Sequence, residues 1–281
     1  MNVKTAKIFS LRLVQHIRDN EATARGAQLS YFLILSIFPF LIFLLAILDY
    51  TPLTHQDTLQ QVSLLLPETA FIVVEQILTE ISSTNQVTLL SFGFLGTIWA
   101  ASRGTFAIIK SLNKAYDTVE SRSFLHLNFI GIISIFALAL VILSSLALLI
   151  FGRVIGQLLF ENLGLEEFFY FLWATLRYLI PVLFIFVVFC FMYLYFPNVS
   201  LRLRSIYPGA VFSTLGWITV SQVFAYYVNN FGNYSRTYGS IGGIIVFLVW
   251  LYISSVVILL GGEINATLHH FLINKANPKI I

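Results

Sequence analysis

The sequence predicts an all-α polytopic membrane protein with six transmembrane helices and amphipathic helices on both sides of the bilayer. Of its 281 residues, 58% are hydrophobic and only 10% are charged, whereas soluble domains carry about 25% charged residues. Residues 29–48 contain no charged side chain, and a helix of that length crosses the ~30 Å hydrocarbon core. Similar stretches recur, and helices satisfy every backbone polar group within lipid.

The predicted spans divide the chain into a cytoplasmic segment 1–28, a single membrane domain 29–268 and a cytoplasmic tail 269–281. They lie at about 29–48, 87–102, 128–151, 178–196, 206–228 and 240–262. The second is short because Arg103 follows its apolar run, so either it crosses at a locally thinned place or its helix continues beyond Arg103. In the first span, Pro39 removes a backbone donor and predicts a kink.

The basic residues orient these spans. Thirteen of the 16 Lys and Arg side chains fall on one side of the predicted topology, and only Arg153, Arg177 and Arg236 fall on the other. Cytoplasmic loops carry the excess of Lys and Arg. We therefore expect a multi-pass protein of the bacterial inner membrane with both termini in the cytoplasm and an even number of spans.

Two amphipathic helices are predicted outside the spans. The outer one lies within 49–86, where an apolar stripe faces a polar one, and it either caps the bundle or gates an outer opening. The inner one follows the second span along the inner leaflet. Its apolar stripe comprises Phe106, Ile109, Leu112, Tyr116 and Val119, and its polar stripe comprises Arg103, Lys110, Lys114 and Asp117. We expect Lys110 and Lys114 to contact anionic headgroups, although an ordinary basic inner loop explains these charges equally well.

Glu263 stands out because it follows about twenty uncharged positions at the inner end of the sixth span. A carboxylate at that depth needs a partner or water, and Arg25 and Arg103 lie at inner ends of predicted spans. One interpretation is a structural ion pair that locks helices together. The other is a protonatable group that couples ion movement to a conformational change.

Small and polar residues mark spans five and six. Gly209, Ser213 and Gly216 form one helical stripe, and Gly239 and Gly243 form a G-x-x-x-G pair, so both spans are expected to have a tightly packed neighbour. The connection between them is unusually polar. It is interpreted either as a plain surface loop or as an outer polar site that dips into a cavity, formed by Asn229, Asn233, Tyr234 and Arg236.

The sequence proposes no catalytic chemistry. It has no G-x-x-x-x-G-K-[ST] phosphate loop, no histidines at metal-ligand spacing and no G-x-S-x-G. We therefore predict no catalytic residue, metal or cofactor, and no enzyme. A net charge of +3 gives no support to a nucleic-acid partner, and nothing in the sequence sets the oligomeric state.

Four segments resemble the YihY/virulence factor BrkB family of bacterial inner-membrane proteins. They are SYFLILSIFPFL, WAASRGTFAIIKSLNKAYD, YFPNVSLRLRSIYPGAVFSTLGW and YGSIGGIIVFLVWLYISSVVILLGGEINA. The resemblance covers residues 20–268 and implies six spans with both termini inside. Some members carry a ribonuclease BN label. This sequence does not support that label, because it has neither a cluster of metal ligands nor a catalytic pair of histidines. The family's association with the cell envelope and serum resistance implies lipid or envelope export.

The favoured function is therefore the binding or translocation of a lipid-like envelope amphiphile, with membrane lipids as partners. A substrate with an anionic head and an apolar tail fits basic inner residues. Spans three and four, nearly free of polar groups over 132–150 and 179–196, offer a hydrophilic solute no path. The alternatives are a small-solute or ion secondary transporter and a non-transporting envelope scaffold; a nuclease is least favoured.

Overall fold

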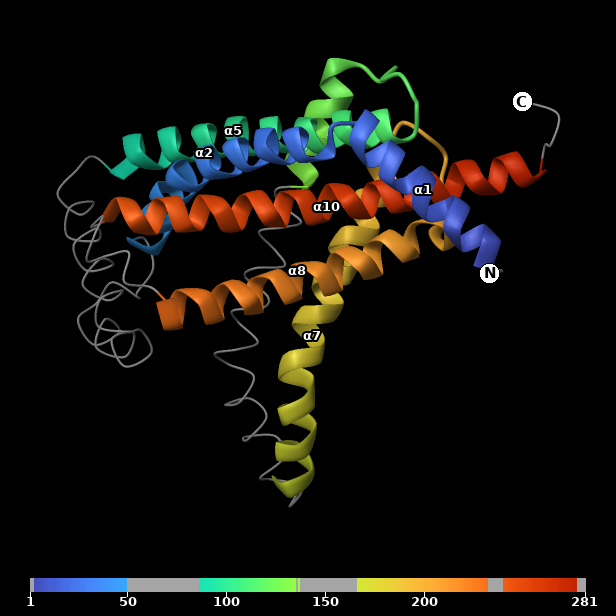
Figure 1. Cartoon of the computed structure of the whole chain (residues 1–281). Coiled ribbons are helices and arrows are strands. Elements are labelled where there is room, and N and C mark those ends of the chain that lie inside the picture. The colour runs from blue at the N-terminus through green and yellow to red at the C-terminus, as the bar shows by residue number, and fades with distance from the viewer. Residues whose placement is uncertain (1–2, 50–85, 135, 137–165, 232–239, 277–281) are drawn as a thin grey trace. The chain divides into compact units, whose positions relative to one another are not determined.

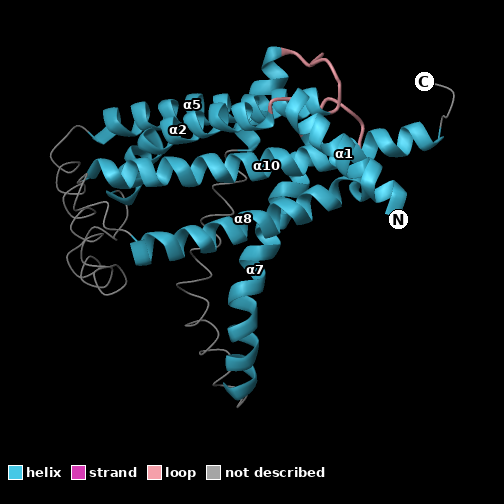
Figure 2. Cartoon of the chain, in the orientation of Figure 1, coloured by secondary structure: helices cyan, strands magenta, loops and turns pink. Residues whose placement is uncertain are grey.

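A computed structural model describes residues 3–49, 86–134, 136, 166–231 and 240–276 (Figure 1). All regular structure in these ranges is helical (Figure 2), which confirms the all-α class. A short apolar helix spans Phe124–Ser134. The main helices are α1 (Val3–Asp19), α2 (Ala22–Asp49), α5 (Gln86–Ala115), α7 (Glu166–Tyr195), α8 (Leu203–Phe231) and α10 (Ser240–Ala276).

Three described helices are long and apolar enough to cross a membrane. These segments, which match the predicted second, fifth and sixth spans, are Ser91–Ala115, Leu203–Val228 and Gly243–Phe271. The predicted fourth span coincides with the shorter apolar stretch Leu179–Tyr195 of α7, and the first lies within α2. Most of the third span and the outer amphipathic helix within 49–86 lie outside the described residues, so the number six stays a prediction.

Of the two alternatives for the second predicted span, the structure shows the longer helix: α5 continues through Arg103 to Ala115. The predicted inner amphipathic helix is therefore the last part of the same helix. It stops where Asp117 adopts a left-handed backbone with φ 52°. The amides of Asp117 and Thr118 then bond the carbonyls of Lys114 and Asn113, the pattern that closes a helix at a left-handed residue. Val119 lies beyond this turn and is 87% exposed, so it does not extend the apolar stripe.

The chain divides into two compact units, residues 1–30 with 105–281, and residues 31–104. In the first unit, α8 packs along α10, α7 packs against α8, and α1 packs against α10 (Figure 1). The main core of this unit gathers where α5 ends, α7 ends and α8 begins. Its buried members are Ile109, Leu112, Phe189, Met192, Tyr193, Phe196, Ile206 and Ala210.

The contact between α8 and α10 depends on small residues. A methyl group added at Gly209 would meet the carbonyl oxygen of Gly261, and one added at Gly216 would lie 2.9 Å from Val257 Cγ1. The small-residue stripe predicted for span five is therefore confirmed. Gly243, in contrast, has no neighbour within 4 Å of such a group. Gly239 lies outside the described residues. Span six does have a tightly packed neighbour, but the close approach of α10 to α8 occurs at Gly261, nearer the inner end of α10.

The second unit contains Pro39 within the continuous helix α2. The hydroxyl of Ser36 donates to the carbonyl of Leu33 at 2.7 Å, and not to the Leu35 carbonyl that Pro39 leaves free. A methyl group added at Gly96 would lie 3.1 Å from Pro39 Cβ, so α5 approaches α2 closely at the proline. The kink itself stays a prediction.

Candidate functional site

A groove of about 670 Å³ opens beside the last two turns of α5 in the first unit. Arg25 from the first turn of α2 lines it together with Lys110 and Lys114 of α5. Its apolar lining includes Phe106, Ile109 and Leu127, and the loop after α5 adds Asp117 and Glu120. We call this cavity the basic groove.

The two lysines of the basic groove share one face of α5 because they are four residues apart. Neither forms an ion pair in the part of the chain that the structure describes, where the pairs are Arg122 with Glu120 and His270 with Asp117. Glu120 therefore has a cationic partner in Arg122, while neither lysine lies within ion-pair distance of a described carboxylate. The structure thus brings Lys110 and Lys114 to one cavity, and their contact with anionic headgroups stays a prediction.

A second polar feature, which the sequence did not predict, fixes one wall of the groove. Arg122 donates to both carboxylate oxygens of Glu120, from Nε at 2.7 Å and from Nη2 at 2.6 Å. Its Nη1 and Nη2 also donate to the carbonyls of Tyr195 and Phe196 at the end of α7. The Arg122 hydrogen bonds outweigh partial burial and lower the pKa of Glu120 to about 2.

Two asparagines, Asn113 and Asn198, add hydrogen bonds to the contact between Arg122, Glu120 and the end of α7. Asn113 donates to Glu120 Oε2 at 2.7 Å and accepts from the backbone amide of Asn198 at 2.7 Å. The side-chain amide of Asn198 donates to the Val119 carbonyl at 2.9 Å. We call Asn113, Glu120, Arg122 and Asn198 the polar clamp. The sequence offered one indication of these contacts: the segments SLNKAYD and YFPNVS each contain an asparagine next to the end of an apolar run.

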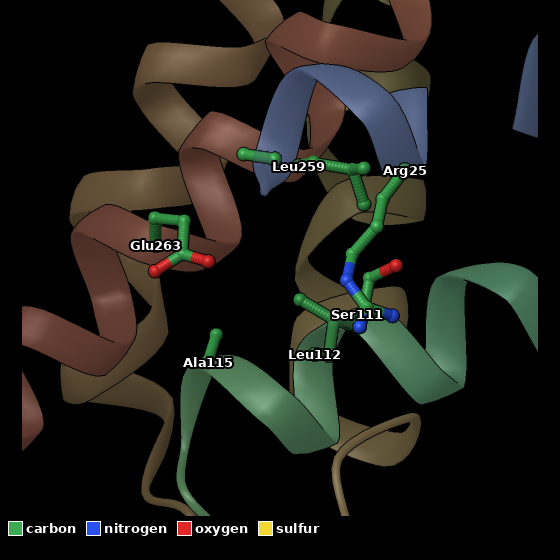
Figure 3. Close-up of a pocket in the computed structure, with 7 residues that line it drawn as sticks. Arg25, Ser111, Leu112, Ala115, Leu259 and Glu263 are labelled. Carbon is green, nitrogen blue, oxygen red and sulfur yellow. The ribbon is translucent and has the colours of Figure 1, made fainter. Parts of the chain in front are cut away.

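Glu263 lies beside the groove, with 3% of its surface exposed. Its Oε2 accepts a hydrogen bond from Asn20 Nδ2 at 3.0 Å. Glu263 and Arg25 line the same small cleft, together with Ser111, Leu112, Ala115 and Leu259 (Figure 3). Arg25 therefore lines both this cleft and the basic groove.

The predicted partner of Glu263 requires a correction. Among the described residues no ion pair joins Glu263 to Arg25; the Arg25 Nε donates instead to the backbone carbonyl of Asn20 at 2.9 Å. The reason is that α1 ends at Asp19 and leaves a carbonyl for a basic side chain to cap. Arg103 belongs to the other unit, where its guanidinium lies over the Trp99 ring, so its pairing with Glu263 stays a prediction.

The predicted outer polar site is not described. Asn229 lies in the last turn of α8, but its side chain is outside the described set, as are Asn233, Tyr234 and Arg236 entirely. This site stays a prediction. No group of three or more His, Cys, Asp or Glu side chains suited to a metal occurs among the described residues.

A buried polar network joins α7, α8 and α10 away from the groove. The Tyr193 hydroxyl lies 2.6 Å from Ser213 Oγ and donates to the Ile258 carbonyl at 2.5 Å. The Gly209 amide donates to Asn265 Oδ1 at 2.7 Å. The sequence analysis identified Gly209 and Ser213 only as packing residues. It missed Tyr193 and Asn265, because their partners lie far away in sequence.

Comparison with known proteins agrees with the membrane interpretation. The family model described as Virulence factor BrkB matches residues 13–279. A ribonuclease-like protein named YfkH from Bacillus subtilis strain 168 is 45% identical over 93% of this chain and 95% of its own length. The UPF0761 membrane protein PSHAa0171 from Pseudoalteromonas translucida is 25% identical over 91% of this chain and 84% of its own.

A UPF0761 membrane protein from Aliivibrio salmonicida, VSAL_I2938, is 27% identical over 97% of this chain and 87% of its own length. No solved structure matches the chain. The family match extends over nearly the whole sequence, and the relatives are covered almost end to end. This chain is a membrane protein of the Virulence factor BrkB family.

Proposed function

We propose that this protein binds, and moves across the bacterial inner membrane, a lipid-like envelope molecule with an anionic head group. The observation that carries the proposal is the basic groove. Arg25, Lys110 and Lys114 line one cavity with Phe106, Ile109 and Leu127. A cavity of that composition suits a charged head and an apolar tail at once.

The charges of the groove favour an anion over a cation. Glu120 is already bonded to Arg122, so the charge of one of the two acidic groups at the groove is compensated by the protein. The lysines are one helical turn apart, about 5–6 Å between their Cβ atoms, which lets both ammonium groups reach one phosphate. Each basic residue near an anionic surface contributes about 1 kcal/mol.

The surroundings favour a ligand that stays partly in lipid. Large apolar side chains remain exposed on the described helices, including Leu215 and Val223 on α8 and Ile244 and Ile245 on α10. Exposed apolar area of this extent marks a membrane-facing surface. The basic residues favour the cytoplasmic side for the groove, with both termini inside.

A scaffold function is the second candidate, and the packed contact between α8 and α10 favours it. An added Cβ at Gly261 would meet Ser213 Oγ and Tyr193 Oη, so these residues pack closely in that contact. A protein that only holds partners needs such rigidity but has no need of a basic groove.

The test is binding of dioctanoyl-phosphatidylglycerol to the purified full chain in a neutral detergent, with dioctanoyl-phosphatidylcholine as the zwitterionic control. We expect binding of the anionic lipid, and a loss of about thirtyfold in the double variant Lys110→Gln/Lys114→Gln, from about 1 kcal/mol for each lysine. The matched control is Arg202→Gln/Arg204→Gln, which removes two exposed charges outside the groove. Equal affinity for both lipids, or equal loss in both double variants, would contradict the proposal.

Movement is tested separately in liposomes that contain a fluorescent phosphatidylglycerol in one leaflet. We expect faster transbilayer exchange with the reconstituted protein, and loss of that acceleration in the lysine double variant. Binding without any acceleration would leave a lipid-binding scaffold as the function.

A further inference from the structure

The buried carboxyl of Glu263 has a neutral hydrogen-bond partner. Asn20 Nδ2 donates to it at 3.0 Å, and an amide can donate equally to a carboxylate or to the carbonyl oxygen of a carboxylic acid. The site is therefore compatible with both protonation states. A structural ion pair, in contrast, holds its carboxyl in the charged form only.

Charged groups surround this carboxyl from several elements. Arg25 faces it from α2, Lys114 from α5, and Asp117 from the loop after α5. The Tyr116 hydroxyl is also near; burial, and then the Glu263 carboxylate, raise its pKa far above its usual range, so it stays neutral. The charge balance at Glu263 thus depends on Arg25 and Lys114, and both of these line the basic groove.

We propose that Glu263 takes up one proton when an anionic head group binds at Arg25 and Lys114, so that the groove binds the anion and the proton together. The inference rests on the proposed function and adds that the proton is the ion whose binding is coupled to binding of the lipid. The carboxylate becomes a carboxylic acid, and no other bond changes. Asn20 keeps its hydrogen bond throughout.

The physical reason is that the Glu263 carboxylate and the bound anion compete for the positive charges of Arg25 and Lys114. In the empty groove, Arg25 and Lys114 offset the negative charge of Glu263. A bound phosphate claims those cations and places a second negative charge beside a carboxyl that is 3% exposed. Like charges in a poorly solvated place favour protonation of one of them. By reciprocity, protonation of Glu263 strengthens anion binding by the same factor.

Calorimetric titration of the full chain with dioctanoyl-phosphatidylglycerol tests this in two buffers of different ionisation enthalpy. The phosphodiester of this lipid stays ionised across the range used. We expect an uptake of up to one proton per lipid that averages about half a proton between about pH 6 and about pH 8, and therefore about tenfold tighter binding at about pH 6 than at about pH 8, within the usual range of coupling.

In Glu263→Gln we expect no proton uptake and the same affinity at both pH values. The matched control, Asp19→Asn, removes an exposed carboxylate next to Asn20 and should keep the proton uptake. Arg25→Gln is an independent check if Glu263→Gln does not fold, because it should weaken binding and reduce the uptake while Glu263 remains. Lipid binding with no proton uptake, or with uptake unchanged in Glu263→Gln, would overturn the inference alone. Absence of lipid binding would overturn the proposed function as well.

Discussion

The contact between α8 and α10 around Gly209, Ser213 and Gly261, together with Tyr193 of α7, is called the seam. The seam and the basic groove both contain polar groups in a mostly apolar molecule, but the polar groups have different partners. In the seam, Tyr193 and Ser213 bond each other and backbone carbonyls, and glycines close the remaining space. In the groove, Lys110 and Lys114 face an open volume without ion pairs in the described chain. The difference indicates that the seam stabilises the fold, whereas the groove keeps its charges for a ligand.

The largest expected effect follows from filling the seam. In Gly261→Val the added carbons would collide with Ser213 Oγ, Tyr193 Oη and the Gly209 carbonyl, and overpacking of this kind costs about 1–3 kcal/mol or more. We expect a clear drop in the melting temperature in detergent. Gly243→Val is the control on the same helix, since nothing lies within 4 Å of its added Cβ. Equal destabilisation of both variants would contradict the close packing.

A smaller effect is expected when one hydrogen bond of the seam is removed. Tyr193→Phe leaves the Ser213 hydroxyl and the Ile258 carbonyl with one partner fewer in a fully buried place, at a cost of about 1–3 kcal/mol. Thermal unfolding of the variant measures it. Tyr195→Phe, on the exposed side of α7, should unfold like the wild type.

The polar clamp gives a pH-dependent prediction. Because the pKa of Glu120 is lowered to about 2, its charged form stabilises the fold above its ordinary pKa of about 4.5, and this stabilisation is lost as the pH falls toward 2. The difference in melting temperature between wild type and Glu120→Gln should therefore be constant near neutral pH and shrink below about pH 4.5. A difference that grows on acidification would show that Arg122 does not bind the charged carboxylate.

The smallest effect on stability is expected in the groove itself. Lys110→Gln removes an exposed charge without an ion pair in the described structure, so unfolding without ligand should change by less than about 0.5 kcal/mol. The same variant should weaken binding of phosphatidylglycerol. A large loss of stability would remove the contrast with the seam.

Features that depend on a single helix could be predicted from the sequence. Apolar length predicted the second, fifth and sixth spans, and α5, α8 and α10 are long and apolar enough to form them; the small-residue stripe predicted the close approach at Gly209 and Gly216. The spacing of Lys110 and Lys114 placed both on one face. Depth in an apolar run predicted that Glu263 is buried.

Features that join distant segments could not be predicted in the same way. Periodicity shows which face of a helix is apolar but not which residue meets it, so Asn20, 243 positions from Glu263, was missed as its partner. The same holds for Asn198 and Asn113, which are 85 positions apart. The sequence also left open whether the second helix continues beyond Arg103, because apolar length alone cannot show that an exposed arginine interrupts neither the helix nor its hydrogen bonds.

The polar clamp has a consequence for how the protein meets bilayers of different thickness. Arg122 bonds the carbonyls of Tyr195 and Phe196 at the end of α7 from the loop that follows α5, so the ends of these two helices are held together. Sliding of α7 past α5 would break charge-assisted bonds, whereas tilting leaves them intact. We therefore expect a thicker or thinner membrane to be matched by tilt and by the opposite ends of the helices, while the clamped ends stay together.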